Sequence, residues 1–230
     1  ASRQQADQQA HQQSDGAQGS ATENAVSQQV QVKSGISEYS WADLSNIAAE
    51  IERTAKNRDD AVRMAASYNL VKPDGSFTGE TKTLQTSMGN ADVFIVDVFK
   101  DKGSSGRSVA FTFMTSGIFA EHPMNPTDSN SGGWKSSGMR AWLNGEVLQS
   151  FPDEMRSGVM AVSKLSNNAG KTTSPASVTE TQDSVWLFSW VECLGPIAWN
   201  ARSNQSYIDT VDNKEGSQYA WFKQQGVAGE

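Results

Sequence analysis

The apolar positions along the chain first become periodic near residue 40, where they predict a helix. Ser40 and Asp43 have the spacing of a capping box, in which each side chain accepts a hydrogen bond from the other residue's backbone N–H. A second helix is predicted for residues 58–68, because Asp59 and Asp60 stand in its favourable first turn. The first helix presents one apolar face, made of Trp41, Leu44, Ile47, Ala48 and Ile51.

Beyond residue 80 the apolar residues alternate, which is typical of strands. Residues 91–99 are apolar on both faces, which favours a central strand, and residues 108–115 follow as its hairpin partner across a Gly/Ser turn. Residues 159–165 and 184–189 are predicted to be further strands. The pattern therefore predicts an α+β fold, with N-terminal helices followed by a mainly antiparallel sheet with short helices.

The segments between these strands are more polar. Residues 121–133 predict a long loop, and a short helix capped by Ser136 or Ser137 follows, with Met139, Trp142 and Leu143 turned inward. Pro152 starts another helical turn. Residues 198–216 predict a loop, and residues 218–224 predict a short amphipathic turn.

The N-terminal segment has a different composition. Residues 1–33 carry ten Gln between Gln4 and Gln31, and the first aromatic residue is Tyr39. With nothing bulky to bury, residues 1–33 are predicted to be a disordered Gln/Ser-rich linker, and residues 34–230 a single domain. A helical Gln/Ala stalk is the alternative for the linker.

Charge and cysteine content narrow the range of partners. The net charge of −7 and the pI near 4.9 make nucleic acid and an anionic membrane surface unfavourable as partners. Binding to either requires clustered Lys and Arg. No apolar run approaches the roughly 20 residues that span a bilayer. The single cysteine, Cys193, can form neither an internal disulfide nor a Cys-based metal site. We expect no nucleic acid partner and no membrane contact by the domain itself.

Catalytic signatures are sparse. His122 is the only imidazole outside the N-terminal segment, and no G-x-S-x-G elbow accompanies it. Carboxylates at predicted strand ends could pair in space as in glycan hydrolases, so this alternative stays open. We therefore expect that the protein is not an enzyme. The carboxylates concerned are Glu121, Glu180, Asp183 and Glu192.

Motifs for metals and phosphate are incomplete. Residues 128–133 begin like a calcium loop, but Met139 stands where the bidentate Glu belongs, which leaves only a looser site through Asp128 and Asn130. Gly170-Lys171-Thr172 lacks the required earlier Gly, because Leu165 occupies that position. No cofactor and no metal are expected, with calcium as the weak exception.

One constellation, residues 132–144, combines a Gly turn, an indole, a helix cap and an Arg. Arg140 is expected at the core edge, where its guanidinium can brace loop carbonyls or a carboxylate bidentately. A direct ligand contact is the alternative role. The candidate ligand-binding residues are Trp134, Arg140, His122, Asn125 and Trp199.

The run Trp134-x-x-Ser137-x-Met139-Arg140-x-x-Leu143-Asn144 resembles a domain of unknown function common in lipoproteins and surface proteins of Gram-positive bacteria. The resemblance covers residues 36–222. It implies export, no assigned activity, a C-type-lectin-like architecture and a role as a display scaffold. Further matching positions are Ile36 to Trp41, Ala120 to His122, Met124, Asn125, Val162, Lys164, Asn167, Asn168, Asp183, Val185 to Ser189, Glu192, Glu215, Gly216, Gln218, Tyr219, Phe222 and Lys223.

The sequence departs from that family's pattern at its C-terminal end. Members usually continue into a Trp-Trp-Leu-Arg-Ser-Pro-like strand and a Gly-Val-x-Pro-x-Phe segment, and this chain has neither. The resemblance therefore implies either a fragment or closing strands supplied from elsewhere. The lectin-like ligand face would lie in that part.

These observations favour an extracytoplasmic ligand-binding or adhesion module, secreted or anchored at the cell surface. Its expected partner is a host or environmental protein or glycan. A structural spacer or display scaffold is the second hypothesis, and a glycan hydrolase is the third.

Overall fold

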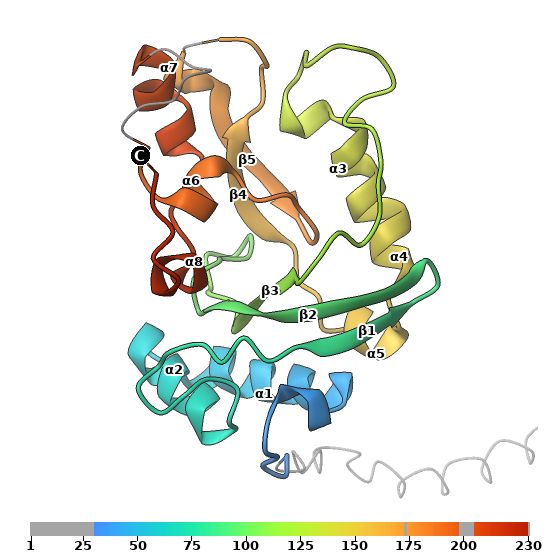
Figure 1. The fold of residues 1–230 in the computed structure, drawn as a ribbon, viewed down its shortest axis with the longest axis vertical. Helices are drawn as coiled ribbons and strands as arrows, with labels where there is room; N and C mark the ends of the chain where they lie inside the picture. Colours follow the sequence, from blue (N-terminus) through green and yellow to red (C-terminus); the bar gives the residue numbers. More distant parts are fainter. Residues whose placement is uncertain (1–29, 173, 198–204, 230) are drawn as a thin grey trace, which may run out of the picture.

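The computed structural model describes residues 30–172, 174–197 and 205–229. A three-stranded antiparallel sheet in the order β1-β2-β3 lies across the middle of the fold, and a two-stranded hairpin of β4 and β5 stands above it (Figure 1). Helices flank both sheets. The fold is α+β, as the sequence predicted.

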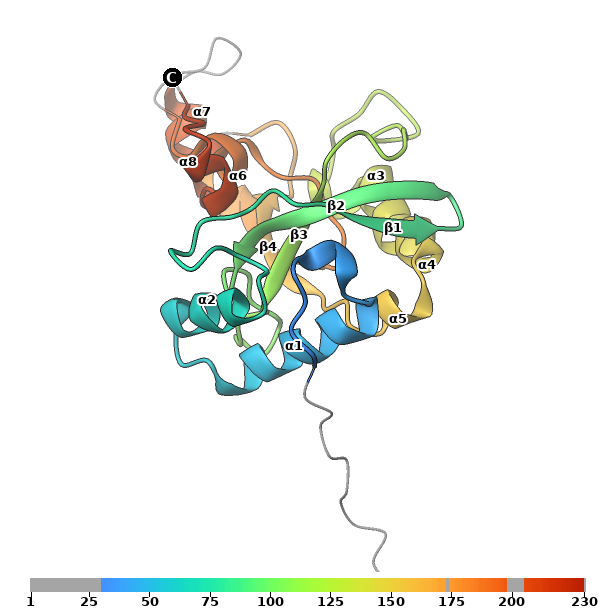
Figure 2. The ribbon, with the colours of Figure 1, turned by 60° about the horizontal axis from the view of Figure 1, so that its bottom comes forward.

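The two N-terminal helices form as predicted. In α1 (Trp41–Thr54), the capping box is complete, because Ser40 Oγ accepts from the Asp43 N–H and Asp43 Oδ2 accepts from the Ser40 N–H, both at 3.0 Å. In α2 (Arg58–Ser67), the cap is the Asn57 side chain. Both helices cover one face of the three-stranded sheet (Figure 2). Their buried side chains include Leu44, Ile47, Ile51, Ala61 and Ala65.

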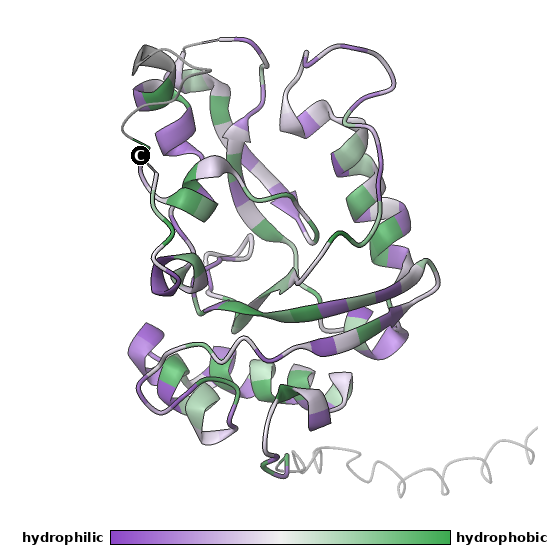
Figure 3. Ribbon diagram, in the orientation of Figure 1, coloured by the Kyte–Doolittle hydropathy of each residue, from purple (hydrophilic) through white to green (hydrophobic). Residues whose placement is uncertain are grey.

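The predicted hairpin is confirmed, and a strand precedes it that the sequence pattern did not predict. β2 (Gly89–Val98) pairs with β3 (Phe111–Thr115) and, on its other side, with β1 (Lys82–Thr86). β2 is apolar along much of its length (Figure 3). Ile95 packs against the helices and Val96 packs on the opposite face, so β2 is the central strand of the sheet.

A helical arm follows the polar loop. The Ser137 side chain accepts from the Arg140 N–H at 3.1 Å and so caps α3, as predicted. Leu143 is buried, whereas Met139 and Trp142 are only half-buried. A turn of π-helix interrupts the arm, a feature often found at functional sites. The arm consists of η2 (Trp134–Ser136), α3 (Gly138–Trp142), the π-turn η3 (Leu143–Val147), α4 (Leu148–Ser150) and α5 (Asp153–Arg156).

The prediction of a strand at residues 184–189 is wrong. β4 (Val162–Asn167) pairs with β5 (Val178–Asp183), whereas residues 184–189 lie outside both sheets. The β-branched residues of β5 pair with β4, with the polar Thr181 and Asp183 turned inward. After β5, Val185, Trp186 and Phe188 are half-buried and Leu187 is exposed, and none of them joins a sheet. The prediction failed because it was based on apolar content alone.

The C-terminal region is more helical than predicted. Residues 205–214 form helices rather than a loop, while Trp199 lies outside the described residues. These helices stand on the side of the β4–β5 hairpin opposite the arm (Figure 1). No helix among the described residues is long and apolar enough to span a membrane. The remaining elements are η1 (Ile36–Glu38), η4 (Pro175–Ser177), α6 (Trp190–Leu194), α7 (Gln205–Thr210), η5 (Asp212–Lys214) and α8 (Ala220–Gln224).

Most of the predicted linker, residues 1–29, lies outside the described residues. Its last positions contact the folded body. The Lys33 N–H donates to Tyr39 Oη at 2.9 Å, and Val30 packs against the core beneath the sheet. The chain therefore joins the domain a few residues before position 34.

Candidate functional site

The first polar cluster, which we call the Asp183 cluster, gathers around a carboxylate that is fully buried at the end of β5. Asp183 Oδ2 accepts from Trp134 Nε1 at 3.0 Å and from Thr181 Oγ1 at 2.5 Å. Asp183 Oδ1 accepts from Arg140 Nε at 2.6 Å and from Asn144 Nδ2 at 3.3 Å. The four donors satisfy the charge of this carboxylate in the interior.

Arg140 braces the end of β5, much as the sequence predicted. Its Nη2 donates to the Gln182 carbonyl at 3.0 Å, although only one guanidinium nitrogen reaches the carboxylate. Asn144, in the π-turn, accepts from the Ser184 N–H at 2.8 Å and donates to the Val185 carbonyl at 2.9 Å. Through these hydrogen bonds, the motif residues attach the arm to residues 182–185. The polar groups of Trp134 and Arg140 point into the domain.

The other candidate ligand-binding residues lie nearby. The His122 ring stacks on Trp142, with 4.7 Å between ring centroids, and its Nδ1 lies 2.8 Å from the Pro123 carbonyl oxygen. Asn125 Oδ1 accepts from the Gly138 N–H at 3.1 Å, and its Nδ2 donates to the Ser129 carbonyl at 2.6 Å. These contacts fasten the polar loop to the start of α3.

Within the described part of the chain, no three His, Cys, Asp or Glu side chains gather in a way that could hold a metal ion. Asp128 is exposed in the polar loop. The Asn130 carbonyl accepts from the Gly133 N–H at 3.0 Å, which makes a turn. Asx-type turn chemistry accounts for this segment.

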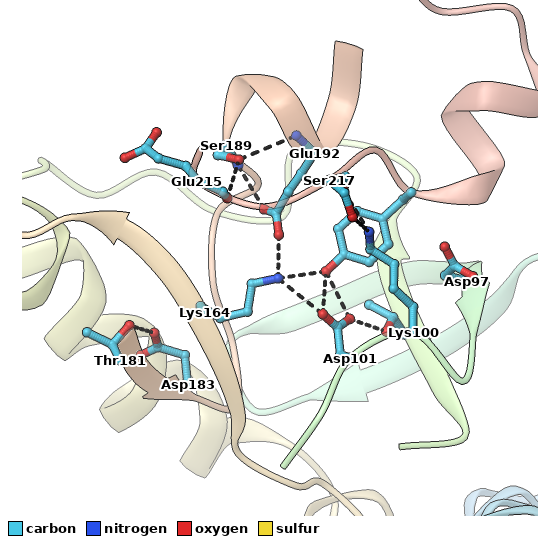
Figure 4. A network of polar contacts seen from close by, with 12 residues as sticks. Asp97, Lys100, Asp101, Lys164, Thr181, Asp183, Ser189, Glu192, Glu215 and Ser217 are labelled. Atoms are coloured by element: carbon cyan, nitrogen blue, oxygen red, sulfur yellow. Dashed lines mark hydrogen bonds and ion pairs between the residues drawn. The ribbon is translucent and has the colours of Figure 1, made fainter. Parts of the chain in front are cut away.

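A second polar cluster lies between the two sheets (Figure 4), and we call it the Lys164 network. The Lys164 ammonium donates to Tyr219 Oη at 2.7 Å and to Asp101 Oδ1 at 3.3 Å, and it forms an ion pair with Glu192. Tyr219 Oη and Thr112 Oγ1 donate to Asp101 Oδ2 at 2.9 and 2.6 Å. The network joins β3, β4, α6 and the start of α8, so it acts as a polar cross-link through the core.

Burial shapes the titration of the groups in and around this network. It raises the pKa of the Tyr219 hydroxyl well above its usual value, with Glu192 and Asp101 acting in the same direction. The Tyr219 side chain is therefore a donor, not a phenolate. Burial also lowers the pKa of Lys100, whose ammonium lies 4.5 Å from the centroid of the Tyr219 ring. The sequence pattern considered Glu192 only as a hydrolase carboxylate and assigned no role to the other residues of the network, although Lys164, Glu192 and Tyr219 were among the positions of the resemblance.

A mostly apolar cavity of about 390 Å³ lies beside β3, and we call it the β3 slot. Its lining comes from α1, from every residue of β3, from the arm, and from the segments 117–120, 158–160 and 184–186, together with single residues that include Leu84 of β1, Val93 of β2 and Val162 of β4. Consecutive strand residues face opposite sides of a sheet, so a space that touches all of β3 must run along its edge. β3 is an edge strand, since β2 is its only partner in the sheet.

Apolar groups line the slot and its rim. Ile118 and Met160 are 87% and 46% exposed, respectively. Trp186 lines the slot, and its Nε1 is the one buried side-chain nitrogen or oxygen in the described residues without a hydrogen-bond partner. A buried donor without an acceptor is unfavourable by about 1–3 kcal/mol. The wall of the slot therefore contains a buried donor that has no partner.

The family described as "Domain of unknown function (DUF6273)" matches residues 111–229, which begin at β3 and end after α8. The chain belongs to this family. No match was found among curated proteins or among solved structures. The matched part of the DUF6273 domain holds the arm, β4, β5 and the C-terminal helices, together with all of the Asp183 cluster.

The carboxylates considered for a hydrolase do not gather in one cleft of the DUF6273 domain. Glu121 and Glu180 are exposed. Asp183 and Glu192 are buried in the two separate polar clusters, where each is held by several donors. None of the four lines the β3 slot.

A second, more polar groove lies between the loop at residues 124–130 and the β4–β5 turn at residues 167–171. Asn125 and Trp134, two of the candidate ligand-binding residues, line it. Their polar atoms bond to Gly138, Ser129 and Asp183. The polar atoms of these two residues are therefore used within the domain.

Glu215 is a titratable group beside the Lys164 network. Its Oε1 accepts from the Asn167 N–H at 2.5 Å. Burial raises the pKa of Glu215 to about 7, and the nearby charges of Asp212 and Glu192 add to the shift, whereas the Asn167 hydrogen bond opposes it. The folded state therefore favours the neutral carboxyl group.

We expect Glu215→Gln to stabilise the domain at pH 8 by roughly 2 kcal/mol, because a neutral amide keeps an acceptor for the Asn167 N–H and buries no charge. In the unfolded chain this carboxyl ionises near 4.5. The parent should lose stability as the pH rises from there to about 7, and the variant should lose less. Urea unfolding from pH 5 to pH 8 measures the difference. The exposed Glu180→Gln is the control, and equal pH slopes for parent and Glu215→Gln would contradict the assignment.

Proposed function

We propose that this chain is a non-catalytic binding module and that the β3 slot is its ligand site. The observation that carries the proposal is the slot itself, an apolar cavity of about 390 Å³ that runs along an unpaired strand edge. Ligand sites are typically concave and mostly apolar, with a few polar groups that fix orientation. The backbone of β3 supplies such polar groups.

We further propose that the module works outside the cell, secreted or anchored at the surface, as an adhesion or ligand-binding domain. The resemblance found in the sequence implies export and a lectin-like architecture, and the Gln-rich N-terminal segment fits a spacer. An apolar slot suits a protein ligand better than a glycan, because sugars present mostly hydroxyl groups. A host or environmental protein is therefore the proposed partner.

A structural spacer or display scaffold is the second candidate function. The Asp183 cluster and the Lys164 network favour it, because both are buried and their charges are paired within the domain. A rigid body of this kind suits a protein that holds variable surface residues in place. A ligand in the β3 slot distinguishes binding from spacing.

An apolar fluorescent dye, 1-anilinonaphthalene-8-sulfonate, tests whether the slot accepts a ligand. We expect saturable binding that Met160→Glu weakens by about fivefold or more, since it places a carboxylate at the mouth of an apolar site. Met88→Glu is the matched control, because Met88 is similarly exposed, 42% against 46% for Met160, but lies on the β1–β2 turn. Thermal unfolding confirms that both variants fold. Equal dye binding by the two variants would remove the slot from the proposal.

A further inference from the structure

The outer edge of β3 presents backbone groups that the sheet does not use. The Ser116 N–H donates to the Asp92 carbonyl at 2.8 Å, and the Ala110 carbonyl accepts from the Phe99 N–H at 2.9 Å. Backbone groups alternate in direction along a strand, so those of Thr112, Met114 and Ser116 point toward β2, whereas the Ala110 N–H donates to Glu52 Oε1 of α1 at 2.9 Å. Those of Phe111, Phe113 and Thr115 point away from β2, into the slot.

The two sides of this edge are both apolar. On one side, Phe113 packs edge-to-face on Trp41 of α1, with 6.0 Å between ring centroids. On the other side, Met114 and Trp186 both line the slot and pack against the buried cluster that contains Phe94 and Val96. An extended chain beside β3 would place alternate side chains against these two surfaces and its N–H and C=O groups against the free backbone. Only an extended polypeptide matches both the two-residue repeat of backbone groups and the apolar surface on either side.

Resting on the proposed function, we infer that the β3 slot takes an extended peptide segment of a partner protein, which adds to the sheet as a fourth strand beside β3. Its apolar side chains would alternate between the α1 side and the Trp186 side. A second copy of this chain fits poorly, because walls from α1 and the arm flank β3 and two recessed edges cannot meet.

The probe is the peptide acetyl-KTVWVLTK-amide, and its control is the same peptide N-methylated on its four central amides. Strand addition predicts saturable binding, with exchange of the Phe113 and Thr115 amide hydrogens slowed about tenfold or more. N-methylation blocks backbone pairing and should weaken binding at least about tenfold. Nuclear magnetic resonance on the isotopically labelled chain measures both effects.

Thr115→Pro blocks the free edge from the protein side. Its N–H points away from β2, so proline removes a donor from the slot without removing a ladder hydrogen bond. Thr115→Ala keeps the N–H. We expect Thr115→Pro to weaken peptide binding about tenfold while Thr115→Ala stays within about twofold. Dye binding should survive in both variants, which shows that the slot is intact.

Each other outcome overturns the inference. Equal binding of the parent and N-methylated peptides would make the slot an apolar pocket and leave the proposed function standing. Binding of the dye but of neither peptide would do the same. Concentration-dependent dimers that Thr115→Pro abolishes would assign the edge to a second copy. If neither the dye nor the peptide binds, the proposed function is overturned as well.

Discussion

Lys164→Met is expected to destabilise the domain by about 3–5 kcal/mol, because it removes the cation that contacts two buried carboxylates directly. The Lys164, Asp101 and Glu192 side chains are 6%, 6% and 4% exposed. Without the ammonium, Asp101 and Glu192 remain in the interior with hydrogen bonds but without a contacting counter-charge, and Lys100 interacts with them only at longer range. Methionine has nearly the volume of the lysine stem, so loss of packing contributes little to the expected effect. Chemical denaturation followed by far-UV circular dichroism measures the loss.

Two further variants separate the charge from the packing. Lys135→Met replaces an exposed lysine on the arm and should change stability by less than about 0.5 kcal/mol. Lys164→Met combined with Glu192→Gln removes one carboxylate and should recover part of the loss, since the two residues contact each other directly. A loss below about 1 kcal/mol for Lys164→Met alone would mean that water or a shift of the carboxylates replaces the lysine.

The parts of the fold that the sequence predicted are those set by local patterns. The capping box at Ser40 and the alternation through β2 depend on residues that are close together in the chain. The same holds for the Ser137 cap. Each pattern describes one element and its buried face, and local physics decides both.

The wrong predictions concern partners that are distant in the chain. β5 is polar, and its strand character comes from pairing with β4 rather than from its own apolar content. The apolar segment after β5, residues 184–189, packs against the three-stranded sheet without pairing with any of its strands. Residues 205–214 are polar and helical, with Ile208 and Val211 buried. The secondary structure of these segments therefore depends on how the rest of the fold buries them.

The candidate site shows the same limit. The motif correctly placed Arg140 beside a carboxylate, but only the fold identifies that carboxylate as Asp183. The Lys164 network joins positions between 101 and 219, and no spacing in the sequence signals such a set. The β3 slot is an absence of packing at a strand edge, a property that belongs to the arrangement of elements and not to any one residue.

Asp183→Ala is the second large expected effect, a loss of about 3–5 kcal/mol. The carboxylate is the common acceptor of Trp134 Nε1, Arg140 Nε and Thr181 Oγ1. Alanine leaves all of these donors without that acceptor. It also removes the counter-charge of a guanidinium whose side chain is 27% exposed. Urea denaturation measures the loss, and fluorescence reports whether the Trp134 indole enters solvent.

Variants of the partner and of an unrelated aspartate show whether the effect belongs to this cluster. Asp128→Ala, in the exposed loop, should stay within about 0.5 kcal/mol of the parent. Arg140→Met should cost less than Asp183→Ala, because Trp134, Thr181 and Asn144 still donate to the carboxylate. If the arm is fastened mainly by this carboxylate, Asp183→Ala should also speed amide exchange in α3 while leaving α1 unchanged. Uniform exchange across both helices would instead show that the arm and the N-terminal helices open together, and that the Asp183 cluster stabilises the whole domain rather than the arm.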